Sequence, residues 1–235
     1  IFDEAALWQK QHQLRVTTDR TTLTRLIKNL SGLTQKDAKR IIRNAIMNDN
    51  AISESDLPGV MDSKYKLLNQ HDVLAFEYDT AKLSEVGGMS RLKEWLQHRH
   101  GFFQGDSGLP KGLDKPKGIL LLGVQGGGKS LAARAIAGEW GVPLMRLDFG
   151  AVYNKFHGES ERNLRSALAA AEGMAPCVLW IDELEKGIGT GTGEHDSGVS
   201  HRVLGTFLTW LSERSAAAKP VFIVATANDI STLPP

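Results

Sequence analysis

The residues with the clearest chemistry form one glycine-rich loop, Gly123-Val124-Gln125-Gly126-Gly127-Gly128-Lys129-Ser130. An apolar run, Ile119–Leu122, precedes this loop, and a helix-like stretch begins at Leu131. Glycines let backbone N–H groups turn inward around a phosphate, and a helix N-terminus adds the positive end of its dipole. In this pattern Lys129 reaches the β- and γ-phosphates and the Ser130 hydroxyl binds Mg²⁺. A glycine turn that carries a lysine by chance is the alternative, but it leaves the strand and helix on either side unexplained.

Two acids follow a second apolar run, in Val178-Leu179-Trp180-Ile181-Asp182-Glu183. At the end of a strand beside the phosphate loop, Asp182 would hold Mg²⁺ directly or through water. Glu183 would then polarise the attacking water as a general base. Alone, such a pair is often only a strand end entering solvent. Together with the phosphate loop, it predicts hydrolysis of a magnesium-bound nucleotide.

A third apolar run, Phe222–Ala227, ends at Asn228. A side-chain amide there can bond the γ-phosphate or the attacking water. A turn-forming Asn at a strand end fits the same pattern equally well, so the residues alone leave both interpretations open.

Short apolar runs alternate with helical stretches in the second part of the chain, which predicts a parallel sheet with helices on both faces. The expected strands are Ile119–Leu122, Leu144–Asp148, Cys177–Ile181 and Val221–Ala227, and the expected helices are Lys129–Trp140, Glu159–Glu172 and Ser200–Ser215. Ser90 is expected to cap an earlier helix with Leu92, Trp95 and Leu96 inward, and a loop is expected from Gly101 to Gly118. The fold class is thus α/β, of the P-loop NTPase type.

Residues 1–80 read as a small helical module without catalytic chemistry, followed by the nucleotide-binding core over 81–235. Two helices are expected first, at Glu4–Leu14 and Thr21–Leu30. A third helix should begin after an N-cap at Thr34 and end at Asn48–Asn50. After a turn-rich segment, 53–59, a fourth helix is expected at Ser63–Val73. The buried faces of the two middle helices follow helical spacing: Leu23, Leu26, Ile27 and Leu30, then Ala38, Ile41, Ile42, Ala45 and Ile46.

Every charged side chain from Arg20 to Arg43 is basic except Asp37. One interpretation is a patch for nucleic acid or an acidic partner. The solvated face of two amphipathic helices is favoured, because no aromatic residues interleave as stacking platforms.

The 235 residues carry a formal net charge of +1, which gives no general attraction to nucleic acid or to an anionic membrane. Cys177 is the single cysteine, which excludes an intramolecular disulfide and suits a reducing compartment. No apolar run has the length of a membrane span and no signal peptide is visible. These features predict a cytoplasmic protein, or a stromal one if it is plastid-encoded. The first and last residues, Ile1 and Pro235, suggest a longer chain at both ends.

Together, these motifs resemble those of an AAA ATPase of the AAA+ superfamily, over about residues 81–235. The residues that carry the resemblance are Val86-Gly87-Gly88, the phosphate loop, Lys155-Phe156-His157-Gly158-Glu159-Ser160-Glu161, Asp182-Glu183 and Asn228. Three stretches are similar to one subgroup, which contains the AAA open reading frame of chloroplast and cyanobacterial genomes and its bacterial relatives: Gly123–Gly126, Ala175–Glu183 and Thr206–Leu211.

The resemblance implies ATP and Mg²⁺ as cofactors and assigns a role to each matched residue. Val86 and Gly87 would lie near the adenine, and the phosphates and metal would be cradled by Gly126, Gly127, Gly128, Lys129, Ser130 and Leu131. Asp182 and Ser130 would serve Mg²⁺, Glu183 would activate water, and Asn228 would be the sensor-1 polar residue.

A substrate-gripping loop is also implied, at Lys155, Phe156 and His157, in which Phe156 is the pore-loop aromatic. His157 departs from the family, where most members have an aliphatic residue. Gly187–Val199 aligns with the second pore loop, and an ordinary surface loop fits its glycine-rich composition equally well.

The family further implies a homo-oligomer, either a hexameric ring or a helical assembly, with each site completed by a neighbour's arginine. The arginine fingers and the helical lid are expected beyond Pro235. Three functions follow: a motor that remodels a protein substrate or complex, a nucleotide-regulated switch or scaffold without substrate threading, and a nucleic-acid-dependent ATPase. The near-neutral charge argues against the third, and no membrane partner is expected.

Overall fold

The computed structural model describes residues 1–13, 16–30, 33–68, 73–104, 115–153, 159–185, 197–214, 220–229 and 231. The chain divides into two compact units, Ile1–Gln70 and His71–Pro235. Their boundary lies ten residues before the position expected at 80, because Leu74–Glu77 is a strand of the second unit's sheet.

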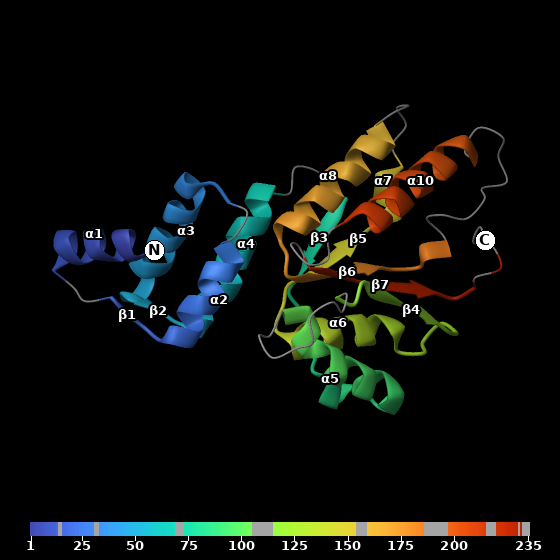
Figure 1. The fold of residues 1–235 in the computed structure, drawn as a ribbon, viewed down its shortest axis with the longest axis horizontal. Coiled ribbons are helices and arrows are strands. Elements are labelled where there is room, and N and C mark those ends of the chain that lie inside the picture. Colours follow the sequence, from blue (N-terminus) through green and yellow to red (C-terminus); the bar gives the residue numbers. More distant parts are fainter. Residues whose placement is uncertain are drawn as a thin grey trace. The chain divides into compact units, whose positions relative to one another are not determined.

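The second unit is built on a five-stranded sheet in the order β3-β5-β6-β7-β4 (Figure 1). Its strands are β3 (Leu74–Glu77), β4 (Gly118–Leu122), β5 (Leu144–Leu147), β6 (Cys177–Ile181) and β7 (Val221–Ala227). Four of them are parallel, as predicted, and every residue of β6 and β7 is buried, as expected for strands covered on both faces. The sequence did not predict β3, which pairs antiparallel with β5 at the sheet edge.

Helices cover both faces of this sheet. One face carries α5 and α6, and the other carries α7, α8 and α10 (Figure 1). Their bounds are α5 Ser90–Gln104, α6 Lys129–Trp140, α7 Phe149–Val152, α8 Glu159–Gly173 and α10 Ser197–Glu213, and the short 3-10 helix η2 spans Leu83–Glu85. The predicted loop start at Gly101 was wrong, because α5 continues to Gln104. No helix within the described ranges is long and apolar enough to cross a membrane.

An aromatic cluster packs α5 and α6 against the sheet. The rings of Phe103 and Trp140 stack at 4.7 Å, and Trp140 meets the Phe222 ring edge-on at 4.7 Å. All three side chains are almost fully buried. This packing fixes α6, and therefore the loop from which α6 begins, against β7.

Arg214 follows α10 and connects it to the starts of two neighbouring strands. Its guanidinium donates to the carbonyl of Val221, the first residue of β7, and to that of Lys117, just before β4, at 2.6 Å. The side chain is 8% exposed, and its guanidinium carbon, Cζ, lies 5.0 Å from the centre of the Trp210 ring. Burial lowers the pKa of Arg214 below its ordinary value.

The first unit is helical, with one short parallel strand pair. Its elements are α1 Phe2–His12, β1 Thr17–Thr18, α2 Arg20–Leu30, α3 Gln35–Asp49, β2 Ala51–Ile52, η1 Glu54–Asp56 and α4 Leu57–Leu68. Its buried core contains Leu26, Leu30, Ile41, Ile42, Ala45, Ile46, Ile52, Leu57 and Val60.

Two predictions for this unit need correction and one is confirmed. Thr34 caps α3 as expected, because its hydroxyl accepts from the Asp37 backbone N–H. Ile27, expected on the buried face of α2, is 52% exposed. The last helix starts at Leu57 rather than Ser63. Pro58 lies in its first turn, where backbone N–H groups have no partner within the helix, so the N–H that proline lacks costs no hydrogen bond.

Candidate nucleotide site

The phosphate loop joins β4 to α6 in the predicted strand–loop–helix arrangement. Gly126 and Gly128 have φ angles of 78° and 81°, which only glycine adopts without strain. A Cβ atom on Gly126 would meet nothing within 4 Å, so the space beside this glycine is open. The loop therefore fits a phosphate group bound by backbone N–H groups.

Lys129 is the first residue of α6, and its ammonium lies at the centre of the site. Nζ donates to the carbonyls of Gly123 and Val124 at 2.6 and 2.8 Å, and to Asn228 Oδ1 at 2.9 Å. Asn228 is 99 positions away in sequence. It reaches Lys129 because β4 and β7 are adjacent parallel strands that end together, with Leu122 opposite Ala227.

Asn228 also connects this lysine to the acids after β6. Its Nδ2 donates to Glu183 Oε1 at 3.4 Å and to Glu185 Oε1 at 2.9 Å. The structure therefore brings Lys129, Glu183 and Asn228, three of the residues singled out by sequence, into one hydrogen-bonded group.

Asp182 and Glu183 are held by a fourth residue, Thr226 of β7. The Thr226 hydroxyl donates to Asp182 Oδ1 at 2.6 Å and accepts from the Glu183 backbone N–H at 3.0 Å. Glu183 has φ 48°, a left-handed conformation that is strained for a residue with a side chain. The bond to Thr226 supports this conformation.

Sequence reasoning missed Thr226 and Glu185. The signal for Thr226 was a hydroxyl inside an otherwise apolar strand, two positions before Asn228 and therefore on the same side of β7. The signal for Glu185 was a third acid, two positions after Glu183.

The residues present fit a magnesium ion that arrives with a nucleotide. Ser130 is the second residue of α6, and Asp182 follows β6 at the same end of the sheet. In the described part of the chain, no three His, Cys, Asp or Glu side chains form a metal-binding group. Mg²⁺ commonly uses one or two protein oxygens together with substrate phosphates and waters, and Ser130 and Asp182 can supply such oxygens.

The segment expected beside the adenine lies next to the phosphate loop. Val86 directly follows η2 and is buried, and its carbonyl accepts from Lys93 Nζ at 2.5 Å. A Cβ atom on Gly128 would be 3.6 Å from Met89 Cε, which places the residues after Gly87 against the loop. Gly87 and Leu131 are both exposed.

Lys155, Phe156 and His157 lie outside the described residues, as does most of the proposed second pore loop. Its last predicted positions, 197–199, belong to α10, which begins three residues earlier than expected.

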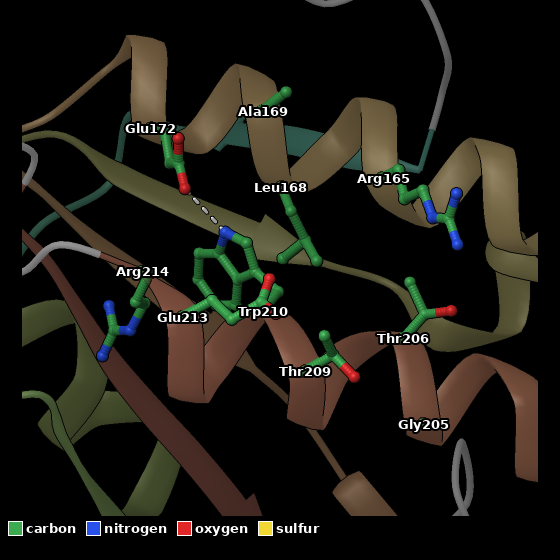
Figure 2. Close-up of a pocket in the computed structure, with 10 residues that line it drawn as sticks. All are labelled: Arg165, Leu168, Ala169, Glu172, Gly205, Thr206, Thr209, Trp210, Glu213 and Arg214. Atoms are coloured by element: carbon green, nitrogen blue, oxygen red, sulfur yellow. Dashed lines mark hydrogen bonds between the residues drawn. The ribbon is translucent and has the colours of Figure 1, made fainter.

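A cavity of about 820 Å³ lies between α8 and α10, and no residue of the phosphate loop lines it. Figure 2 shows Trp210 crossing from α10 toward α8, where Nε1 donates to Glu172 Oε1 at 2.7 Å. The described residues that line this cavity include neither the phosphate loop nor the acids after β6, so they do not form the phosphate site predicted from the sequence.

The AAA family, described as "ATPase family associated with various cellular activities", matches residues 119–235. The chain belongs to the AAA ATPase family. A second AAA description, "SpoVK-like AAA ATPase, second domain", matches residues 1–71, which is nearly the first compact unit.

Individual relatives of this AAA ATPase confirm the predicted subgroup. The "Uncharacterized AAA domain-containing protein ycf46" of Pyropia yezoensis is 42% identical over 222 residues, 94% of this chain and 44% of the relative. Its counterpart in Guillardia theta is 40% identical over 225 residues, 96% and 44% of the two chains. The human "ATPase family gene 2 protein homolog A" is 32% identical over 168 residues, 66% and 18% of the two chains. The chain thus spans less than half the length of these relatives.

Proposed function

We propose that this AAA ATPase binds Mg-ATP and hydrolyses its terminal phosphate bond. The supporting observation is the hydrogen-bonded connection from Lys129 through Asn228 to Glu183. It joins a phosphate-binding cation to a carboxylate through an amide that can contact both the phosphate and a water.

Each side chain has one part in this proposal. The phosphate loop and Lys129 bind the phosphates, and Ser130 and Asp182 hold Mg²⁺, which would neutralise charge on the phosphate oxygens. Glu183 takes a proton from the attacking water, and Asn228 orients that water or the γ-phosphate. Val86 and Gly87 lie beside the base, and Leu131 beside the phosphates.

Two substitutions test the proposal. Glu183→Gln keeps the shape of the side chain but removes the base, so ATP should still bind while its hydrolysis falls by about 10²–10⁴-fold. Lys129→Ala should weaken ATP binding itself. Fluorescent-nucleotide titration and phosphate release separate the two effects, and an unchanged hydrolysis rate in Glu183→Gln would contradict the proposal.

We further propose that turnover remodels a protein substrate in a hexameric ring or helical assembly, with Lys155, Phe156 and His157 contacting that substrate. The support is the family membership and the place of these residues in the sequence, between α7 and α8. Phe156→Ala should spare basal ATP hydrolysis and abolish remodelling. If the cellular function survives this change, the alternative of a nucleotide-regulated scaffold without threading is favoured.

We propose that the first unit binds a protein partner and not nucleic acid. Much of its basic segment is paired with acids: Arg25 with Glu54, Arg40 with Asp37, and both Lys39 and Arg43 with Glu4. Paired side chains release fewer counterions on binding a polyanion, so we expect no strongly salt-dependent binding of DNA or RNA. We place the activity in the cytoplasm, or in the stroma of a plastid, because a single cysteine, Cys177, suits a reducing compartment.

A further inference from the structure

We propose that Glu185 is a positioning residue that fixes the orientation of Asn228 in the ATP site. This inference rests on the proposed function, and it concerns a residue for which neither the motifs nor the relatives supply a role. Glu185 acts through Asn228 and needs no contact of its own with ATP.

Two donors of Asn228 converge on one oxygen of Glu185. The backbone N–H of Asn228 donates to Glu185 Oε1 at 3.0 Å, and the side-chain Nδ2 donates to the same atom at 2.9 Å. One bond fixes the end of β7, and the other fixes the rotation of the amide. Together they leave Asn228 a single arrangement.

The chemistry of the neighbours determines which way this amide faces. The ammonium of Lys129 offers only donors, so the amide must present Oδ1 to it. Nδ2 then faces the carboxylates, where the bond to Glu185 is 0.5 Å shorter than the 3.4 Å bond to Glu183. Glu185 is therefore the stronger anchor, and Glu183 is left with a weak contact that a water or phosphate oxygen can replace.

The second oxygen of Glu185 indicates that this position is specialised. Oε2 is buried and has no hydrogen-bond partner among the described residues. A buried carboxylate oxygen without a partner is destabilising, so packing alone does not favour a glutamate here. The two hydrogen bonds from Asn228 to Oε1 offset this cost.

The test combines kinetics with a spectroscopic measurement on three variants of the protein. Glu185→Ala removes the acceptor, Glu185→Gln retains one carbonyl oxygen that can accept both N–H groups, and Asn228→Ala removes the residue being positioned. Glu139→Ala, an exposed acid on α6, is the matched control. Circular dichroism and thermal unfolding establish that each variant is folded.

We expect Glu185→Ala to lower kcat for ATP by about 10- to 100-fold, the scale of loss that a 1 Å misplacement causes, with little change in KM. Glu185→Gln should restore most of this loss. In the Asn228→Ala background, Glu185→Ala should have almost no further effect, because the residue through which it acts is gone. Losses that multiply in the double variant, or a Glu185→Ala variant with the parent kcat, would overturn the proposal.

The spectroscopic arm does not depend on turnover. The side-chain amide signals of Asn228, identified by their absence in Asn228→Ala, should shift in ¹H–¹⁵N spectra of Glu185→Ala and stay near the parent positions in Glu185→Gln. Unshifted signals in Glu185→Ala would also overturn the proposal. If Glu185→Ala shows these shifts but the parent protein hydrolyses no ATP, the proposed function is disproved and the positioning role still stands.

Discussion

Thr226 is a hydroxyl residue in a strand whose other side chains are apolar. It is fully buried, and its one oxygen both donates to Asp182 and accepts from the Glu183 backbone N–H. A buried hydroxyl costs little when both of its hydrogen bonds are made. Thr226 therefore stabilises a left-handed Glu183 conformation and fixes the carboxylate that we assign to Mg²⁺.

We predict that Thr226→Val lowers both stability and activity. Valine has nearly the same shape but leaves Asp182 Oδ1 and the Glu183 N–H without this partner, which should cost about 1–3 kcal/mol of unfolding free energy. ATP hydrolysis should fall by about 10-fold or more, since Asp182 and Glu183 lose their alignment. Urea unfolding and phosphate release measure the two effects. Thr209→Val on the exposed side of α10 is the control, and equal behaviour of the two variants would contradict the prediction.

For single residues, the sequence predicted those that belong to motifs and missed those that hydrogen-bond to them. Lys129, Asp182 and Glu183 were predicted from local patterns. For Asn228 the pattern fitted a turn residue equally well, and only the family resemblance assigned it to the site. Thr226 and Glu185 act on partners that are 44 and 43 positions away. Only the pairing of β6 with β7 makes those contacts visible.

Helix α6 approaches the backbone of the segment before η2 very closely at Gly138. A Cβ atom there would lie 2.0 Å from the carbonyl oxygen of Ala81, so the helix and the segment before η2 touch backbone to backbone. The same helix begins at Lys129, and its packing therefore determines where the phosphate loop lies.

We predict opposite effects for two glycine-to-alanine changes in helices. Gly138→Ala forces α6 away from Ala81 and should destabilise the protein by about 1–3 kcal/mol, as overpacking does. Gly205→Ala in α10 meets nothing within 4 Å and should stabilise it by about 0.5–1 kcal/mol through helix propensity. Chemical denaturation of both variants tests this, and a stabilising Gly138→Ala would show that the close approach is not maintained in solution.

Periodicity predicted α6, β6 and β7 with the bounds that the structure has, because each is a long, uniform pattern. It failed at β3, whose four residues follow a helical stretch and gain their strand conformation from pairing with β5. It also failed at α4, where Pro58 and Gly59 were interpreted as helix breakers although they lie in the first turn.

At the scale of whole units, the first unit carries a pH-sensitive ion pair. Glu4 is 4% exposed and accepts from Arg43 at 2.8 Å, with Lys39 at 3.7 Å. The hydrogen bond from Arg43 is the main cause that lowers the pKa of Glu4 from its ordinary value of 4.5. A lowered carboxyl pKa means that the ionised form stabilises the fold above 4.5, and that this contribution is lost as the pH falls through the folded-state pKa.

We therefore predict that Glu4→Gln lowers the thermal stability of the first unit at neutral pH and makes its acid unfolding less steep. Parent and variant should converge only once the pH falls below the lowered folded-state pKa of Glu4, where Glu4 in the parent is protonated too. Unfolding curves recorded across this range provide the measurement, with the exposed Glu54→Gln as control. A constant difference at every pH would exclude the assigned role of ionised Glu4.

For the whole molecule, we predict ATP-dependent assembly. In related systems an arginine supplied in trans raises hydrolysis by about 10³–10⁵-fold, which makes turnover depend on neighbouring subunits. Full-length protein carrying Glu183→Gln should therefore show a larger particle in light scattering with ATP than without nucleotide. Specific activity of the parent should also rise with protein concentration. A monomer under all nucleotide conditions would contradict the assembly.

The guanidinium of Arg214 has a consequence for the opposite end of the sheet. It bonds the starts of β4 and β7, whereas Lys129 and Asn228 follow the ends of the same strands. A slip of one residue between these strands would move Asn228 by about 3.3 Å and turn its side chain to the other face. Hydrolysis would then stop although the fold looked intact. If the proposed hydrolysis takes place, ATP turnover would therefore also report the alignment of β4 with β7, whose starts Arg214 bonds together.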